Sequence, residues 1–160
     1  MASIATIGVY GFDRDSFLET LADAGIGLLL DVRQRRGVRG SEYAWANARR
    51  LQSALDEAGI RYTHVKELAP TTELRELQYE ADARLGEGKR SRTALAPEYA
   101  RRYTEEILDR ADIDSVVRWI GGSTAALLCV ERDPEACHRS LIAARLEHDW
   151  GFAVRHLRPE

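Results

Sequence analysis

The sequence predicts an α/β fold built on a mostly parallel five-stranded sheet, with helices on both faces of the sheet. Short β-rich runs alternate with helical stretches along the chain. Two helical stretches end in the same way, with a glycine and an isoleucine leading into a strand, at Gly25-Ile26 and Gly59-Ile60. Parallel neighbours need crossover connections long enough to hold a helix, and this alternation supplies them. The expected strands are Ile4–Val9, Leu28–Val32, Ile60–Val65, Ala125–Val130 and Phe152–Leu157.

The first two helices are predicted from capping residues and from apolar side chains four residues apart. Asp13 can cap a helix that ends at Gly25. Leu51 and Leu55 lie on one face of a second helix, which ends at Gly59. Each helix follows one strand and precedes the next, as a crossover helix does.

The middle of the chain is different, because residues 71–119 are helical in pattern and strongly charged. Pro97 suits the first turn of a helix that runs to about Asp109. We therefore expect one α/β domain over residues 1–160, with residues 71–119 as a helical insertion between the third and fourth strands. The insertion should lie over or beside the strand ends, with a mobile tip near residues 86–92.

Composition and charge exclude several classes of protein. The 160 residues are 44% hydrophobic and 31% charged, which is ordinary for a soluble globular protein and excludes collagen-like and disordered chains. The net charge of −3 excludes a polycation. The N-terminus does not resemble a signal peptide, and the longest apolar stretch, Ala24–Leu30, is too short to span a membrane. With two cysteines and no CxxC, we expect a cytoplasmic protein with free thiols and no membrane partner.

The strand ends select the first candidate site residues, since ligands of open parallel sheets bind beyond the carboxyl ends of the strands. Asp31 and Arg33 follow the second expected strand, Glu131 follows the fourth, and Gly8 and Tyr10 follow the first. A carboxylate in such a place serves as an acid or base, or forms a structural ion pair with a neighbouring arginine.

The last helix has the clearest start signal, with Asp133 as its N-cap and Pro134 as its first residue. Cys137 would then end the first turn, where the helix terminus and Arg139 favour a thiolate and an anion site. An alternative is that Cys137 and His138 pack into the core, where a small cysteine and a hydrogen-bonded histidine are common. Cys129, inside an apolar run, is interpreted as a core residue. Zinc is not expected, because Cys129, Cys137 and His138 fit no usual ligand spacing.

The segment Arg33–Arg50 carries six arginines and one acid, with Tyr43 and Trp45 among them. Such a segment can grip phosphates and stack bases. It can equally be a solvated connection whose tryptophan packs into the core, and the high arginine content of the whole chain favours this second interpretation.

Several short motifs together resemble the family called domain of unknown function 488, over nearly the whole chain. The motifs are Thr6-Ile7-Gly8, Leu30-Asp31-Val32-Arg33, Gly59-Ile60-Arg61-Tyr62, Leu68-Ala69-Pro70, Leu127-Leu128-Cys129-Val130-Glu131, Asp133-Pro134 and Cys137-His138-Arg139-Ser140. The resemblance implies an α/β fold and an enzymatic activity that is not established. The residues that match the family's motifs at the strand edge are Asp31, Arg33, Glu131, Cys137, His138 and Arg139.

This chain departs from the family pattern at Val9, where a histidine or tyrosine is common, and at Arg36, near a common proline. A weaker likeness to rhodanese-type sulfurtransferases and cysteine phosphatases fails on spacing. Arg139 lies ten residues after Cys129 and two after Cys137, and neither interval closes the phosphate loop of those enzymes.

These observations predict an enzyme with an anion-binding pocket at the strand ends, for a small phosphate or carboxylate ligand. The expected catalytic residues are Asp31 or Glu131 as acid or base, and Cys137 as a nucleophile positioned by His138. The expected anion-binding residues are Gly8, Tyr10, Arg33, Arg139 and Ser140. No metal or other cofactor is expected, and self-association is left open.

Two other functions remain open at the level of sequence. The first is a non-catalytic nucleotide- or nucleic-acid-binding module that uses Arg35, Arg36, Arg39 and Trp45, with weak and salt-sensitive binding. The second is a thiol-based redox or sulfur-transfer protein in which Cys129 and Cys137 pair.

Overall fold

The computed structural model describes residues 2–160 and contains a five-stranded sheet in the order β3-β2-β4-β1-β5. All neighbouring strands are parallel. The strands are β1 (Ser3–Ile7), β2 (Leu28–Asp31), β3 (Arg61–His64), β4 (Ala125–Leu128) and β5 (Ala153–Leu157). The predicted α/β class and the five parallel strands are therefore confirmed.

Four of the strands end one or two residues earlier than the sequence predicts. Val9, Val32 and Val130 were expected to close strands, but they lie beyond the last ladder pair and are buried in the loops that follow. Their apolar side chains seal the carboxyl edge of the sheet. The loops after β1, β2 and β4 consequently begin inside the protein, where they can line a site.

Within residues 2–160, six α-helices accompany the strands. They are α1 (Arg14–Asp23), α2 (Ala48–Glu57), α3 (Thr72–Arg84), α4 (Pro97–Glu106), α5 (Ile113–Ile120) and α6 (Arg139–Trp150). Four short 3-10 helices cover Ser41–Ala46, Lys66–Leu68, Leu108–Arg110 and Pro134–Ala136. Asp13 caps α1 by accepting a bond from the Ser16 amide, as predicted. Gly25 and Gly59 follow α1 and α2 with φ of 70° and 73°, a conformation that glycine adopts without strain.

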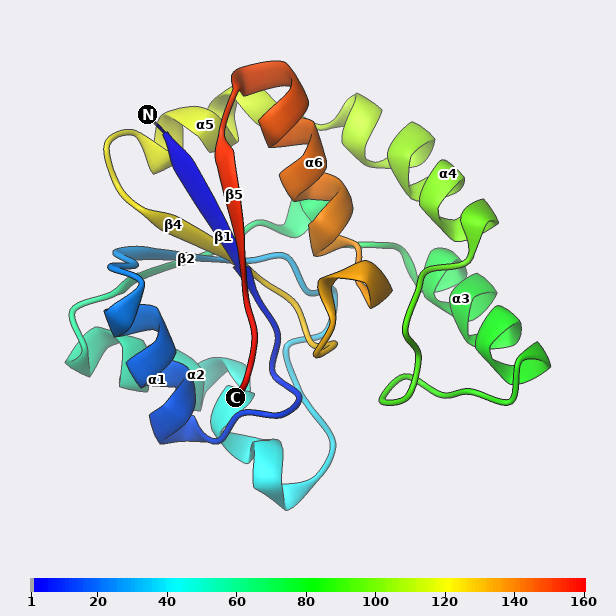
Figure 1. Cartoon of the computed structure of the whole chain (residues 1–160), viewed down its shortest axis with the longest axis horizontal. Helices are drawn as coiled ribbons and strands as arrows, with labels where there is room; N and C mark the ends of the chain where they lie inside the picture. Colours follow the sequence, from blue (N-terminus) through cyan, green and yellow to red (C-terminus); the bar gives the residue numbers. More distant parts are fainter. Residues whose placement is uncertain (1) are drawn as a thin grey trace.

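The connections place helices on both faces of the sheet, as predicted. The chain first moves from β1 to β2 and β3, with α1 and α2 on one face, and then returns through β4 to β5, with α5 and α6 on the other (Figure 1). This reversal follows from the right-handedness of parallel crossovers. The chain leaves the neighbouring strands β2 and β4 toward opposite faces, so a crevice opens between their carboxyl ends.

The expected insertion is helical, and its helices pack against different parts of the protein. α3 and α4 pack on each other beside the carboxyl ends of the strands, and Tyr103 of α4 donates a 2.6 Å bond to the Leu68 carbonyl. α5 instead covers the sheet with its buried residues Ile113, Val116 and Ile120. Only the segment from α3 to α4 is placed to cover a site.

The start of the last helix differs from the prediction. Asp133 and Pro134 begin only the 3-10 turn Pro134–Ala136; the backbone is extended at Cys137, and α6 begins at Arg139. The Asp133 carboxylate caps no amide and instead pairs with Arg158, from the C-terminal segment, at 3.4 Å. Cys137 therefore lies in a break between two helical segments and not in the first turn of a helix.

Among residues 2–160, no helix is long and apolar enough to cross a membrane.

Candidate functional site

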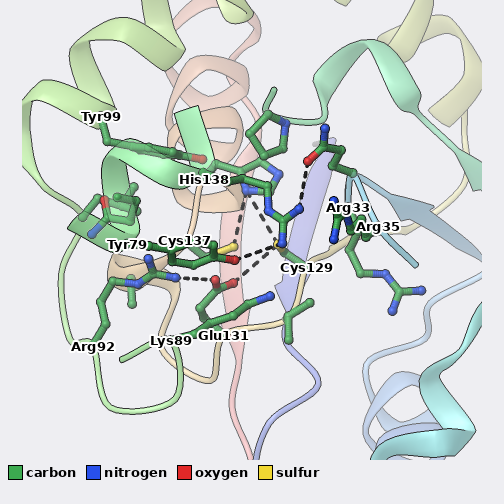
Figure 2. A pocket seen from close by; sticks show the side chains of 17 residues that line it. Arg33, Arg35, Tyr79, Lys89, Arg92, Tyr99, Cys129, Glu131, Cys137 and His138 are labelled. Atoms are coloured by element: carbon green, nitrogen blue, oxygen red, sulfur yellow. Dashed lines mark hydrogen bonds and ion pairs between the residues drawn. The ribbon is translucent and has the colours of Figure 1, made fainter. Parts of the chain in front are cut away.

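A cavity lies at the crevice between the carboxyl ends of β2 and β4. Its cavity volume is about 50 Å³. Arg33 reaches it from the loop after β2, Glu131 from the loop after β4, and His138 from the break before α6 (Figure 2). The segment from α3 to α4 forms the remaining wall. Four residues predicted as site residues, Arg33, Glu131, Cys137 and His138, thus line one cavity.

The floor of the cavity is a group of buried polar side chains, which we call the floor cluster: Cys129, Glu131, Cys137 and His138. Nδ1 of His138 lies 3.6 Å from Sγ of Cys129 and 3.8 Å from Sγ of Cys137. Oε2 of Glu131 lies 3.5 Å from Sγ of Cys129. Each of the four residues is less than a tenth exposed. Two thiols, an imidazole and a carboxylate therefore meet on one side of the sheet edge.

Burial and mutual charge shift the titration of the floor cluster. Burial raises the pKa of Cys129 and the pKa of Glu131. Burial would also raise the pKa of Cys137, but a hydrogen bond from Cys129 and the positive charges of His138 and Arg139 lower it well below its usual value. Burial alone would lower the pKa of His138, yet the facing Cys137 raises it. Without any bound ion, Cys137 and His138 thus favour a thiolate–imidazolium pair.

Glu131 is connected to the insertion through Arg92. The Arg92 guanidinium donates to Oε1 of Glu131 and, at 3.1 Å, to Oδ2 of Asp82 on α3. All three side chains are buried. This arrangement fixes one carboxylate oxygen of Glu131 and leaves Oε2 directed toward the sulfur of Cys129.

The mouth of the cavity carries three basic residues, which we call the mouth cations: Arg35, Arg75 and Lys89. In the part of the chain that the structure describes, none of them forms an ion pair with an acid. Arg75 donates to Oε1 of Gln34 and to the hydroxyl of Tyr79, both at 2.9 Å. Arg35 and Arg75 have no acidic partner among the described residues, and Lys89 acts on the nearby Glu131 without forming an ion pair with it. The mouth therefore has a positive potential although the chain has a net charge of −3.

Asp31 does not line the cavity. It is fully buried and accepts bonds from Nε of Arg33 at 2.9 Å and Nη2 at 2.8 Å, and a further bond from the Tyr62 hydroxyl. Nη1 of Arg33 donates to the carbonyl of Ala46 at 2.9 Å. The geometry is that of a structural ion pair, the alternative that the sequence left open for these two residues.

Arg139, Gly8, Tyr10 and Ser140, expected to bind an anion, also lie outside this cavity. Arg139 is fully buried and donates from Nη1 to the carbonyl of Glu131 at 2.6 Å and from Nη2 to that of Arg132 at 3.2 Å. The two carbonyls accept from both terminal nitrogens, while the buried Nε has no hydrogen-bond partner among the described residues. Arg139 therefore shapes the loop after β4.

The other three residues have local contacts. Gly8 packs against the Glu131 carbonyl so closely that a Cβ atom on Gly8 would overlap the oxygen. The ring of Tyr10 stacks at an angle on Tyr43, 5.2 Å between centroids. The Ser140 hydroxyl donates to the Cys137 carbonyl at 2.8 Å, so it supports the break before α6.

The arginine-rich segment has two different parts. Trp45 packs on Phe17 with 4.9 Å between ring centroids, and Arg36 donates to the Tyr62 hydroxyl, so these two are part of the packed structure. Arg35 and Arg39 line a second, outer hollow that shares Arg75 and Lys89 with the cavity. A positive groove therefore leads from the surface to the floor cluster.

The expected site left out several residues that line the cavity: Cys129, Arg75, Lys89, Arg92 and Tyr99. Cys129 lies at a strand end, as Glu131 does, but its place in an apolar run favoured the interpretation as a core residue. The other four belong to the insertion, whose side chains reach the site through the packing of α3 and α4, and no local pattern indicates this. Tyr99 is buried beside the cysteines, and burial raises its pKa well above the usual value.

Comparison with known proteins gives one match, to the family model of a domain of unknown function, DUF488, over residues 13–146. No curated protein and no solved structure matches the chain significantly. The matched region contains α1, the β2 and β4 edges and the first two thirds of α6, and hence the whole floor cluster. Because it covers most of the 160 residues, the chain belongs to the family of domain of unknown function DUF488.

Proposed function

We propose that the protein is a cytoplasmic enzyme that acts on a small anion, which the mouth cations bind and the floor cluster converts. A single observation carries this proposal. Three basic side chains without an acidic partner among the described residues surround a cavity whose floor holds two thiols, an imidazole and a carboxylate. Cations that bind a ligand, set beside buried groups with perturbed pKa values, are typical of active sites.

The charge balance around the cavity favours an anionic ligand. Arg33 is neutralised by Asp31, and Arg92 is shared between Asp82 and Glu131. Among the described residues, Arg35 and Arg75 have no acidic partner, and Lys89 forms no ion pair although its charge acts on the nearby Glu131. A phosphate or carboxylate group would neutralise them, and the planar guanidinium groups can hold either anion with two parallel hydrogen bonds.

Glu131 is the group best placed to move a proton in this reaction. Burial raises its pKa, which brings a carboxylate closer to the range in which it can act as acid and base near neutral pH. Arg92 holds one of its oxygens, while the other faces the sulfur of Cys129 and the cavity. Cys137 and His138, which complete the floor cluster, supply the group that reacts with the anion.

Thermal unfolding in the presence of inorganic phosphate, acetate or adenosine monophosphate tests the proposal. A ligand at about 100 times its Kd stabilises a protein by about 2.7 kcal/mol. We expect such stabilisation in the wild type and its loss in Arg35→Gln and Lys89→Gln. Arg50→Gln is the matched control, because Arg50 is an exposed arginine remote from the cavity lining. Equal stabilisation in all four proteins would contradict the assignment of the mouth cations.

The outer hollow supports a second candidate function, the binding of a nucleotide or single-stranded nucleic acid. Its cavity volume is about 660 Å³, and five cations line it together with Tyr10 and Tyr79. The cations are Arg35, Arg39, Arg75, Lys89 and Arg90, of which Arg90 pairs with Glu42. Phosphates on cations and bases on aromatic rings are the usual combination for such binding.

Fluorescence anisotropy with a labelled oligonucleotide separates the two candidates. For a protein of net charge −3 we expect weak association that declines steeply with salt, since each phosphate contact releases counterions. Tight association that persists at physiological salt, and that Arg39→Gln weakens, would instead favour the nucleic-acid function.

A further inference from the structure

We propose that Cys129, Cys137 and His138 bind a divalent transition-metal ion, for which zinc is the best match, through the two sulfurs and Nδ1 of the imidazole. The three residues are the only group of metal-ligating side chains with this convergence among residues 2–160. Thiolate and imidazole are the ligands that zinc prefers, and a site with three protein ligands is typical of catalytic zinc.

The distances match a tetrahedral ion. Nδ1 of His138 is 3.6 Å from one sulfur and 3.8 Å from the other, and the three atoms lie within 4.8 Å of one another. Zinc binds sulfur at about 2.3 Å and nitrogen at about 2.0–2.1 Å, so its tetrahedral ligands stand roughly 3.5–3.8 Å apart. An ion can therefore enter between the three atoms with only small movements of the side chains.

The orientation of His138 is an independent indication. Its Nε2 bonds to the main-chain oxygen of Val32 at 2.9 Å. A carbonyl oxygen only accepts, so Nε2 carries a hydrogen and Nδ1, which faces both sulfurs, is the nitrogen with a lone pair when the ring is neutral. Histidines that bind metals are held in this way, with the other ring nitrogen donating to a carbonyl or carboxylate.

The local backbone explains how adjacent residues can bind one ion. Cys137 has extended backbone angles and His138 has helical ones, because the 3-10 turn Pro134–Ala136 ends before α6 begins. The direction of the side chains changes at this break, and both lie beside Cys129, the residue that follows β4 (Figure 2). Spacing rules for zinc sites assume ligands on hairpins or on single helices, which is why the sequence argued against a metal.

Charge and access are also suitable. Two thiolates would neutralise a divalent ion, and Glu131 is already paired with Arg92. All three proposed ligands line the cavity, so the fourth position of the ion would face it. A water molecule or the anion bound by the mouth cations could occupy that position, next to Glu131. A role of the ion in the reaction rests on the proposed function, whereas binding of the ion does not.

Metal binding can be measured on the reduced wild-type protein after treatment with a chelator. Native mass spectrometry should show one zinc ion per chain. Cobalt should give the intense thiolate-to-metal absorption and the visible bands of a tetrahedral site. Loss of a hydrogen bond to a metal-ligating side chain lowers metal affinity by roughly 10–100-fold. Because Cys129→Ser, Cys137→Ser and His138→Gln each remove a ligand itself, we expect each to lower zinc affinity by more than this. His148→Gln, at an exposed histidine, should bind zinc as the wild type does.

The wild-type measurements decide the question even if the substituted proteins do not fold. Absence of stoichiometric zinc and of tetrahedral cobalt spectra would overturn the proposal, as would unchanged affinity in a folded cysteine variant. Phosphate is then added to the metal-free protein. Stabilisation by phosphate together with failure to bind zinc would leave the proposed function in place and make Cys137 a direct nucleophile. Zinc binding without any response to anions would support the metal site and contradict the proposed binding of an anion by the mouth cations.

Discussion

Nε2 of His138 and the main-chain oxygen of Val32 form a 2.9 Å hydrogen bond between residues 106 positions apart in the sequence. Val32 follows β2, and His138 precedes α6, the crossover that leaves β4. The bond therefore spans the crevice where the two connections separate. It forms only when β2 and β4 are paired, so the orientation of the imidazole in the floor cluster depends on the central pairing of the sheet.

The buried pair of Asp31 and Arg33 should be a major contributor to stability. Arg33→Met would leave the fully buried Asp31 carboxylate without its cation, and breaking such a pair costs about 3–5 kcal/mol. Urea unfolding measures the change in the free energy of unfolding. Arg101→Met is the control, because its ion pair with Glu105 is exposed and should contribute at most about 1 kcal/mol.

The double variant Asp31→Leu, Arg33→Met provides a second check on the same pair. It removes both charges, and replacing a complete buried ion pair with apolar groups is often neutral. We expect it to be more stable than Arg33→Met alone. If Arg33→Met alone lowered the free energy of unfolding by less than about 1 kcal/mol, the buried Asp31 carboxylate would not depend on Arg33 for its stability.

Tyr62 should make the folded protein sensitive to alkaline pH. Burial and the charge of Asp31 raise the pKa of Tyr62 to about 12, from an ordinary value of 10.0. A group whose pKa is raised by folding stabilises the protein below the unfolded pKa, and this contribution is lost as the pH rises through the folded value. Stability should therefore decline between pH 10 and pH 12.

Tyr62→Phe isolates this contribution from those of Tyr99 and Tyr103, whose pKa values burial also raises. The variant lacks the hydrogen bond to Asp31, so we expect lower stability near neutral pH and a smaller decline between pH 10 and pH 12. Ultraviolet titration of tyrosinate should show one fewer late-titrating group. A decline of unchanged size would mean that Tyr62 titrates normally.

Local patterns predicted the fold well and the site only in part. Strand alternation and the glycine stops at Gly25 and Gly59 are local signals, and the elements they indicate are present. The rule of the strand ends also brought Glu131 to the correct edge. By contrast, Asp133 was expected to cap the last helix, but its carboxylate pairs with Arg158, 25 residues later in the sequence. Such a long-range contact competes with a capping signal, and no short motif reveals it.

Arg139 was predicted to bind an anion in the cavity, but the cations that line the cavity mouth are Arg35, Arg75 and Lys89. Arg139 follows the conspicuous cysteine and histidine, yet its two terminal nitrogens donate to carbonyls of the loop after β4. Lys89 and Arg75 have no motif around them and reach the cavity only because α3 lies beside the strand ends. Which cations remain unpaired is a property of the tertiary structure.

Gly8 should be required for packing. A Cβ at this position would overlap the carbonyl oxygen of Glu131 and lie 2.9 Å from its carbon, both main-chain atoms that cannot rotate away. Gly8→Ala should therefore lower the free energy of unfolding by about 1–3 kcal/mol, the usual cost of overpacking. It should also displace Glu131 and weaken the response to anions.

Gly27→Ala is the matched control, because a Cβ on Gly27 would have no atom within 4 Å and its φ is not positive. This variant should be neutral or more stable by about 0.4–1 kcal/mol, since alanine restricts the unfolded chain. Equal effects of the two substitutions, measured by urea unfolding, would show that the contact between Gly8 and the Glu131 carbonyl is not restrictive.

Arg92 should hold the insertion against the floor cluster. Its buried guanidinium joins Asp82 of α3 to Glu131 after β4, so Arg92→Met would leave two buried carboxylates without a cation. By analogy with other broken buried pairs, we expect the free energy of unfolding to fall by about 3–5 kcal/mol if α3 stays packed against the cavity.

A less costly response to Arg92→Met is available, because α3 can move away from the cavity and let water reach both carboxylates. Hydrogen exchange distinguishes the two responses: opening would speed amide exchange in α3 and in residues 86–95, while β1, β2 and β4 stay protected. Arg84→Met, at an exposed arginine of the same helix, should leave exchange unchanged. Uniformly faster exchange in the sheet and the insertion would instead show that Arg92 stabilises the fold as a whole and has no separate role in closing the cavity.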